Sequence, residues 1–104
     1  MKTHAPTCAE KLKALADTTR LAVLESLLDQ PKLVSELMSL LDIEQSLLSH
    51  HLAHLREAGL VQSVRKGKTV RYQLAPDVVM STAANALDLG CCQLSFPTQF
   101  KKRT

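Results

Sequence analysis

The stretch from Glu44 to Gly59 reads EQSLLSHHLAHLREAG and is the most informative part of the sequence. Leu48, Leu52 and Leu55 recur at helical spacing, which predicts a helix with one apolar face. Gly59 predicts the end of this helix, because glycine readily adopts the left-handed conformation that follows a helix C-terminus. The opposite face carries polar side chains with almost no acid among them: Gln45, Ser46, Ser49, His50 and His54. Such a face can approach the edges of DNA bases and the phosphate backbone without electrostatic repulsion; a solvated face of an ordinary amphipathic helix is the alternative.

Length and composition indicate one small helical domain. The 104 residues are 45% hydrophobic, which suits a folded chain with a modest core. Aromatic residues make up only 3% and Trp is absent, so Leu, Val and Ala must build that core, and packed helices are expected. The net charge of +3 is mild, but between residues 56 and 71 five basic side chains accompany a single acid, Glu57. This distribution predicts a local basic surface.

The sequence shows neither a membrane-spanning segment nor a signal segment, and this indicates the expected cellular compartment. No apolar run approaches the roughly 20 residues that span a bilayer, and no apolar signal segment opens the chain. We therefore expect a soluble cytoplasmic protein without a membrane partner. Three cysteines are an odd number in a chain that is not cysteine-dense, which predicts free thiols and no structural disulfide framework.

Two helices are expected near the N-terminus. Thr7, with Glu10 three residues later, forms the capping-box pattern of a helix that runs to about residue 16. Asp17 or Thr18 is the expected N-cap of a second helix, which Pro31 ends.

A third helix completes a motif with the stretch quoted first. It is expected over about residues 33–41, with leucines as its apolar stripe, and residues 42–43 leave room only for a tight turn. Two short helices joined by such a turn are the arrangement of a helix-turn-helix.

The periodicity changes from helical to alternating after Gly59. Residues 60–64 predict one strand, and the alternation over 70–74 predicts a second. The turn between them is RKGK, so the hairpin has a basic tip and basic sides: Arg65, Lys66, Lys68 and Arg71. A helix-turn-helix followed by a basic hairpin is the layout of a winged helix. Its recognition helix fits the major groove, and its wing reaches flanking phosphates.

A last helix is expected from its N-cap Asp77 to Gly90. It is apolar on more than one side, so we expect it to pack both on its own domain and on a second copy of the chain. The expected fold is one domain over 1–104, mainly α with a small β-hairpin, in the order α-α-α-α-β-β-α. The tail after residue 90 is expected to be irregular, and residues 1–6 and 95–104 to be flexible.

Three segments resemble the ArsR/SmtB family of bacterial transcriptional repressors: LADTTRL at 15–21, EQSLLSHHL at 44–52 and LREAGLV at 55–61. With KGK at 66–68 and Arg71-Tyr72, the resemblance covers roughly residues 9–90. It implies a homodimeric repressor that binds palindromic double-stranded operator DNA, dimerises through its first and last helices and is released by an inducer. It also implies major-groove contacts from Gln45, Ser46, Ser49 and His50, and wing contacts from Lys66, Lys68 and Arg71.

Two inducer sites known in that family are missing from this sequence. The Cys-x-Cys type of cluster on the helix before the recognition helix is absent, since residues 33–38 contain no cysteine. In the zinc or nickel site of the last helix only Asp77 is present. The other three positions hold Val79, Gly90 and Gln93, and one carboxylate alone cannot hold a transition metal.

Three cysteines remain as candidate ligands: Cys8 on the first helix, and Cys91 and Cys92 after the last. Gly90 can end the helix so that Cys91 and Cys92 turn inward together, and packing of the first helix against the last brings Cys8 near them. Three soft thiolates suit trivalent arsenic or antimony. Adjacent cysteines near the end of the last helix also resemble those of some arsenite-responsive family members. We therefore hypothesise a repressor released when arsenite, As(III), or Sb(III) binds these three thiols, from one subunit or from two.

Several alternatives stay open for the same residues. Cys8 and one of the paired cysteines could form a disulfide or polysulfide in a redox or persulfide sensor, and another thiophilic metal could bind. Cys8 could also be an ordinary small hydrophobic residue. A small thiol enzyme is disfavoured, because no glycine- or arginine-rich anion-binding loop accompanies any cysteine, so we expect no enzyme and no catalytic cofactor. A winged helix that binds only proteins is disfavoured by the basic wing.

Overall fold

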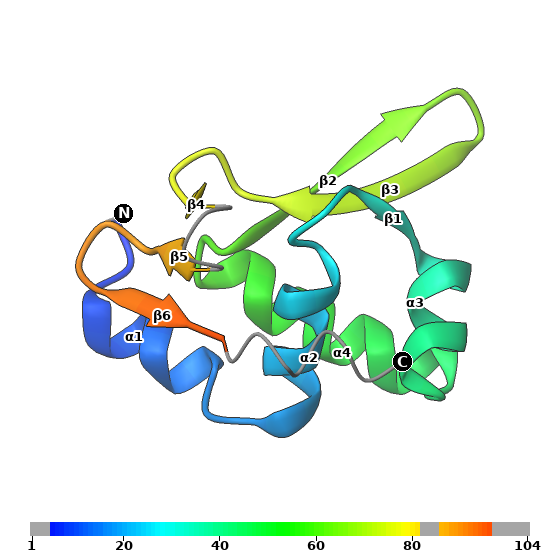
Figure 1. Ribbon diagram of the computed structural model, residues 1–104. Helices are drawn as coiled ribbons and strands as arrows, with labels where there is room; N and C mark the ends of the chain where they lie inside the picture. Colours follow the sequence, from blue (N-terminus) through cyan, green and yellow to red (C-terminus); the bar gives the residue numbers. More distant parts are fainter. Residues whose placement is uncertain (1–4, 82–85, 97–104) are drawn as a thin grey trace.

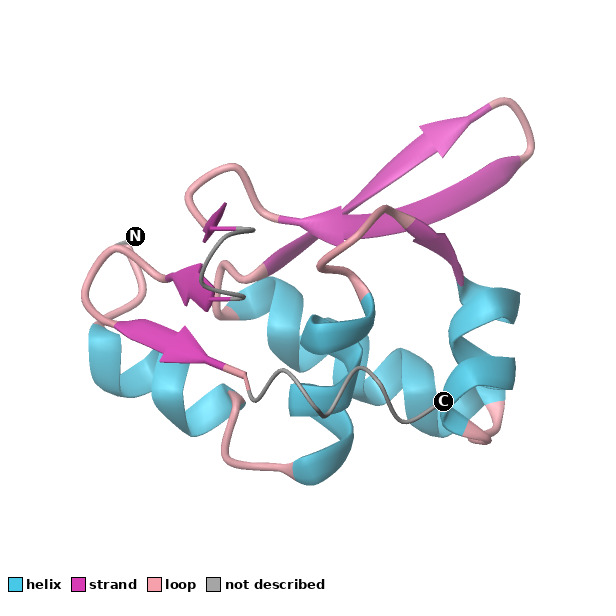
Figure 2. Cartoon of the chain, in the orientation of Figure 1, coloured by secondary structure: helices cyan, strands magenta, loops and turns pink. Residues whose placement is uncertain are grey.

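The structure is a computed structural model that describes residues 5–81 and 86–96. Within these residues the helices gather into one group and the β2–β3 hairpin extends away from them (Figures 1 and 2). The helices are α1 (Cys8–Ala14), α2 (Thr18–Ser26), α3 (Val34–Leu41) and α4 (Gln45–Glu57). The strands are β1 (Lys32–Leu33), β2 (Val61–Lys66), β3 (Thr69–Leu74), β4 (Val79–Ser81), β5 (Ala86–Asp88) and β6 (Gln93–Ser95).

The first two helices begin where their capping residues predict. Thr7 Oγ1 accepts a hydrogen bond from the Glu10 backbone N–H at 3.1 Å, and the Thr7 N–H donates to Glu10 Oε1 at 2.8 Å. The side chain of Asp17 caps α2. However, α2 ends at Ser26 and not at Pro31, because Lys32 Nζ donates to the Ser26 carbonyl at 2.8 Å and so satisfies the end of the helix.

The turn between α3 and α4 is tight, as expected. Asp42 has φ 53°, a left-handed conformation that a short polar side chain tolerates. Glu44 precedes α4 without a side-chain capping bond. After α4, Gly59 has φ 76° and the Leu60 N–H donates to the Leu55 carbonyl at 3.0 Å, so the helix ends at the predicted glycine.

The predicted hairpin is present and one more strand joins it. β2 and β3 pair antiparallel from Val61 opposite Leu74 to Lys66 opposite Thr69, and Gly67 in the turn has φ 63°. β1 pairs with the other edge of β3, which gives the order β1-β3-β2. The two residues of β1 are too few to produce an alternating pattern, so this strand was not predicted.

Aliphatic side chains build the core, as the composition predicts. The helices α2 to α4 and both sheets contribute to it, and the largest fully buried side chains are Val23, Leu24, Leu37, Leu48, Leu52, Leu55, Leu60, Leu87 and Leu89. At about 25 cal/mol per Å² of apolar surface, burying each leucine contributes roughly 1.5–3 kcal/mol. Within the described residues no helix is long and apolar enough to cross a membrane.

The prediction of a last helix over 77–90 is wrong for the described residues. β4, β5 and β6 form a second antiparallel sheet in the order β4-β5-β6, and Gly90, with φ 91°, lies in the turn between β5 and β6. A stretch that is apolar on several sides cannot bury all of them as one helix in a single chain. Folded into strands, it buries Leu87 and Leu89 in the chain's own core.

The prediction for the tail is partly wrong. Residues 93–95 form β6 and Phe96 is buried, so the chain after residue 90 is not irregular throughout. The ends expected to be flexible fall largely on residues 1–4 and 97–104, which lie outside the described residues. The dimer interface was expected to use the first and last helices, and in the described residues the last of these helices is replaced by strands.

Candidate functional site

The recognition helix α4 has one buried and one exposed face. Leu48, Leu52 and Leu55 are buried in the core, together with His51. The candidate DNA-contacting residues at the beginning of α4 are all exposed: Gln45, Ser46, Ser49 and His50. Because the polar face of α4 points away from the core, these side chains can contact the base edges when the helix enters the major groove of DNA.

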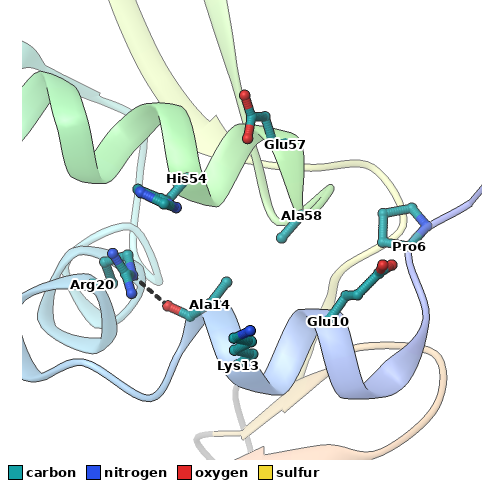
Figure 3. A pocket seen from close by; sticks show the side chains of 8 residues that line it. All are labelled: Pro6, Glu10, Lys13, Ala14, Arg20, His54, Glu57 and Ala58. Carbon is teal, nitrogen blue, oxygen red and sulfur yellow. Dashed lines mark hydrogen bonds between the residues drawn. The ribbon is translucent and has the colours of Figure 1, made fainter.

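His54 lies at the edge of this face, beside α1. It lines a cavity of about 460 Å³ between α1 and α4, together with Lys13 and Arg20 (Figure 3). Its ring lies 4.7 Å from that of His50, edge to face. Of the five predicted side chains on α4, His54 is therefore the one that faces another helix of the same chain.

The basic residues of the wing are also exposed: Arg65, Lys66, Lys68 and Arg71. Arg71 Nη1 lies 4.0 Å from Glu36 Oε1 on α3, at the limit of an ion pair, and both side chains are close to half exposed. A pair of this kind contributes little and leaves the guanidinium available to a phosphate.

Arg56 was absent from the predicted DNA contacts although its position favours one. It is exposed near the end of α4, and its Nη1 donates to Tyr72 Oη on β3 at 3.3 Å. A positive charge therefore sits at the junction of α4 and the wing. The sequence signal was its spacing of seven residues from Ser49, which puts both on one side of the helix.

His51 on α4 lies within hydrogen-bond distance of Arg20 on α2. Arg20 Nη1 lies 3.3 Å from His51 Nδ1, and Arg20 Nε donates to the Ala14 carbonyl at 2.6 Å. Burial lowers the pKa of His51, and the Asp17 carboxylate offsets part of this effect. The neutral imidazole can then accept the Arg20 hydrogen bond on Nδ1 with its proton on Nε2.

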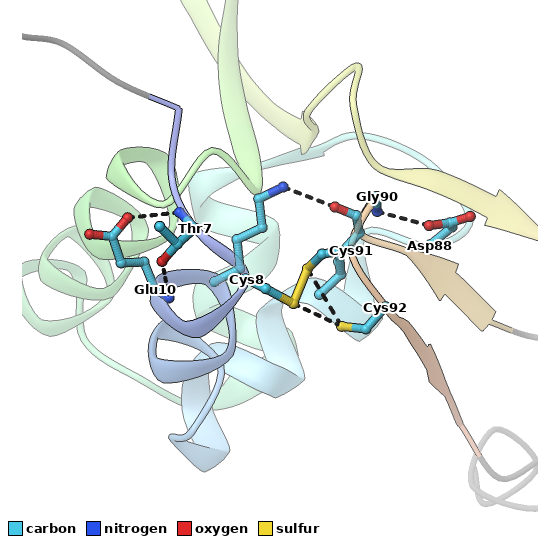
Figure 4. The surroundings of a disulfide bond; sticks show 9 residues. Thr7, Cys8, Glu10, Asp88, Gly90, Cys91 and Cys92 are labelled. Atoms are coloured by element: carbon cyan, nitrogen blue, oxygen red, sulfur yellow. Dashed lines mark hydrogen bonds between the residues drawn. A yellow bond between two sulfur atoms is a disulfide. The ribbon is translucent and has the colours of Figure 1, made fainter.

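The three cysteines lie together, although by a different route from the one predicted. Cys8 begins α1, whereas Cys91 and Cys92 lie in the β5–β6 turn and not at a helix end (Figure 4). Their three Sγ atoms are all within 4.8 Å of one another. No other group of three or more potential metal-binding side chains occurs in residues 5–81 and 86–96.

Two of these cysteines form a disulfide, which corrects the prediction of free thiols. Cys8 and Cys91 are bonded, with their Cα atoms 5.7 Å apart, and Cys92 is free and half-buried. The bond forms because the fold brings the β5–β6 turn against the first turn of α1, a contact across 83 residues of sequence. Cys92 Sγ lies 3.7 Å from Cys8 Sγ and 3.8 Å from Cys91 Sγ.

Polar contacts hold the cysteine-bearing turn in place. Lys11 Nζ on α1 donates to the Leu89 carbonyl at 2.9 Å, and Asp88 Oδ1 accepts the Gly90 N–H at 2.8 Å. The Leu89 N–H donates to the Cys92 carbonyl at 2.8 Å and closes the turn. The positions of Cys91 and Cys92 are therefore fixed relative to α1 by contacts besides the disulfide.

The sequence matches a known family of regulators over its central part. The model of the bacterial regulatory protein arsR family matches residues 17–63, from the N-cap of α2 into β2. The "Probable mercury resistance operon repressor" of Streptomyces lividans is 37% identical over 98 residues, which cover 86% of this chain and 78% of that protein. This chain belongs to the ArsR family.

Other relatives match a shorter part of the chain. The transcriptional activator HlyU of Vibrio cholerae is 48% identical over 62% of this chain, and the arsenical resistance operon repressor of Escherichia coli K12 is 43% identical over 64% of it. The matches span 59% and 57% of those two proteins, less than two thirds of their length. These relatives are transcriptional regulators and not enzymes, in agreement with the prediction for this chain.

Solved structures confirm the winged helix-turn-helix fold. HlyU from Vibrio cholerae superposes with a TM-score of 0.62 at 46% identity, over 64% of this chain and 73% of that one. The homodimeric winged helix-turn-helix DNA-binding domain Mb0332 from Mycobacterium bovis gives 0.63 at 29% identity, over 66% and 64%.

Proposed function

We propose that the protein is a homodimeric transcriptional repressor that binds double-stranded operator DNA in the cytoplasm. The exposed polar face of α4 enters the major groove, where Gln45, Ser46, Ser49 and His50 meet base edges and phosphates. The wing residues Arg65, Lys66, Lys68 and Arg71 neutralise flanking phosphates. The family membership and the fold of the neighbouring structures support this proposal.

Two further α4 residues flank this surface. Arg56 adds a phosphate contact between recognition helix and wing, since its guanidinium is exposed there. His54 contributes at the edge of the surface near α1, where its exposed ring can reach a backbone phosphate.

The single observation that carries the effector proposal is the convergence of Cys8, Cys91 and Cys92. The two non-bonded Sγ distances are 3.7 and 3.8 Å, so Cys92 Sγ lies in contact with both other sulfurs. After reduction of the disulfide, only the Cys8–Cys91 pair has to open.

Trivalent arsenic fits this triangle of thiols, and trivalent antimony fits it by the same chemistry. Three cysteine thiols displace the three hydroxyls of arsenous acid, which forms three As–S bonds and releases three water molecules. The lone pair of arsenic takes the fourth corner, so no fourth ligand is needed. That relatives are named for arsenical and mercury resistance supports a thiophilic inducer.

A redox or persulfide switch is the second candidate, and the observed disulfide favours it. Hydrogen peroxide can oxidise the Cys8 and Cys91 thiols to this disulfide: the two thiols lose two electrons and two protons, and the peroxide is reduced to two molecules of water. The two candidates exclude each other at any one moment, because the disulfide consumes two of the three arsenic ligands.

The test is operator release by the reduced and the oxidised protein in parallel. Anaerobic reduced protein on the promoter DNA of its own gene is titrated with arsenite, antimonite, hydrogen peroxide and a persulfide donor, with fluorescence anisotropy as the readout. Release by arsenite at one ion per three thiols, only from the reduced protein, supports the arsenic sensor. Release by oxidants alone supports the redox switch, and no binding to the promoter contradicts the repressor.

A further inference from the structure

Helix α1 is attached to the rest of the chain by a few defined contacts. It has no fully buried residue of its own, although Ala14 packs against the core. At its first residue it is attached through the Cys8–Cys91 disulfide, and at its middle through Lys11 Nζ, which donates to the Leu89 carbonyl. At its end the Ala14 carbonyl accepts a 2.6 Å hydrogen bond from Arg20 Nε. A change at the thiols can therefore shift α1 as a unit.

A cavity of about 460 Å³ separates α1 from the recognition helix in this region. Figure 3 shows Arg20 between the two helices, bonded to Ala14 on one side and below α4 on the other. Its Nη1 reaches His51 Nδ1 on α4 at 3.3 Å. One planar guanidinium thus connects the end of the thiol-bearing helix with the buried side of the DNA-reading helix.

On the basis of the proposed function, we propose that Arg20 couples the state of the thiols to the orientation of α4. When the disulfide is reduced and the three sulfurs bind an ion, the Cys8–Cys91 pair opens from a bonded to a non-bonded distance, and α1 shifts against the β5–β6 turn. The Ala14 carbonyl moves with it, and the guanidinium follows its acceptor. Because the same group is bonded to His51, α4 rotates and its exposed face loses the match to the groove. Arg20 is a positioning residue and touches neither DNA nor ion.

Arg20→Lys is the variant that tests this coupling. Lysine keeps the positive charge but presents one ammonium, which cannot hold both acceptors in the fork geometry of a guanidinium. The quantity measured is the ratio of operator Kd with and without arsenite, for reduced protein. We expect this ratio to fall by about tenfold in Arg20→Lys, within the roughly 5- to 150-fold range of typical couplings, while arsenite binding, followed by S–As absorbance without DNA, remains.

Two companion variants separate coupling from mere stability or charge. Lys13→Met removes a positive charge from the wall of the same cavity but leaves the Arg20 bridge in place, so its ratio should equal that of the wild type. His51→Asn keeps an acceptor near the position of Nδ1 and should retain most of the ratio. A structural defect alone would weaken operator binding equally with and without arsenite and leave the ratio unchanged.

A measurement without DNA tests the coupling even if arsenite is not the inducer, because it also compares the reduced protein with the disulfide form. The His51 imidazole signals in NMR spectra should differ between reduced, disulfide and arsenite-treated wild-type protein, and should stop responding in Arg20→Lys. An unchanged ratio in Arg20→Lys, or a His51 signal that ignores the thiols in the wild type, overturns the coupling. A wild-type protein that binds its operator and ignores arsenite instead contradicts the proposed inducer, and the His51 signals still decide the coupling.

Discussion

Asp17 begins α2 with its side chain, because Oδ1 accepts hydrogen bonds from the Thr19 and Arg20 backbone N–H groups at 2.9 and 3.0 Å. Asp17→Ala removes this acceptor, and we expect the free energy of unfolding to fall by about 1 kcal/mol. Asp17→Asn keeps an oxygen at the same position and should lose much less. Urea denaturation of the reduced proteins at neutral pH measures the difference; equal losses would contradict the capping role.

His51 predicts a pH dependence of stability. Its pKa in the folded chain lies below the ordinary value of 6.5, first because of burial. As the pH falls through 6.5, the unfolded chain binds the proton first, so the free energy of unfolding decreases until the lower folded pKa is reached. Urea denaturation between about pH 7 and pH 5 should show this decrease, and His51→Asn should flatten it. An equal slope in that variant would contradict the assignment.

Single residues that fix local backbone geometry were predictable from the sequence. Gly59 adopts the left-handed conformation expected of it, and Asp42 lies in the expected tight turn, since these preferences depend on the residue itself. The meeting of Cys8 with Cys91 and Cys92 was predicted from the packing of two helices. It occurs through a strand turn, and the disulfide was only an alternative to the expected free thiols, because pairing across 83 residues depends on tertiary contacts that spacing does not encode.

The wing is the element whose contribution to DNA binding is electrostatic. Replacing Lys66 and Lys68 with alanine should weaken operator binding and reduce the slope of log K against log salt by about 0.9 for each phosphate that is no longer neutralised. Lys13→Ala, on α1, is the matched control that changes charge without touching the wing. Anisotropy titrations at several salt concentrations give the slope. If Lys66→Ala and Lys13→Ala change the slope of log K against log salt equally, a contact between the wing and DNA is contradicted.

The elements α1 to α4 and the β2–β3 hairpin followed from local sequence signals, namely apolar periodicity and capping residues. The structure of residues 77–96 did not follow from such local signals. Its apolar residues fit a helix that a second copy covers, but in the single chain strands bury Leu87 and Leu89 without a partner. Hydrophobic pattern alone could not distinguish the two, since both arrangements bury the same side chains.

At the scale of the whole molecule, we predict a dimer to which α1 contributes. Leu12 on α1 is 43% exposed, an apolar side chain available to a second copy. Leu12→Glu should shift the sedimenting species toward the 11.4 kDa monomer and weaken operator binding. Leu40→Glu, 59% exposed on α3, is the control that should remain dimeric. If both variants form dimers of equal stability, the prediction that α1 contributes to the interface is contradicted.

The most direct test of the three-thiol site is Cys92→Ser. This variant keeps the Cys8–Cys91 pair and removes only the third sulfur, which lies 3.7 and 3.8 Å from the other two. In an operator-release titration with reduced protein, we predict that Cys92→Ser binds DNA like the wild type and no longer releases it with arsenite. It should still form the disulfide with peroxide. Release at the wild-type arsenite concentration would contradict the three-thiol site.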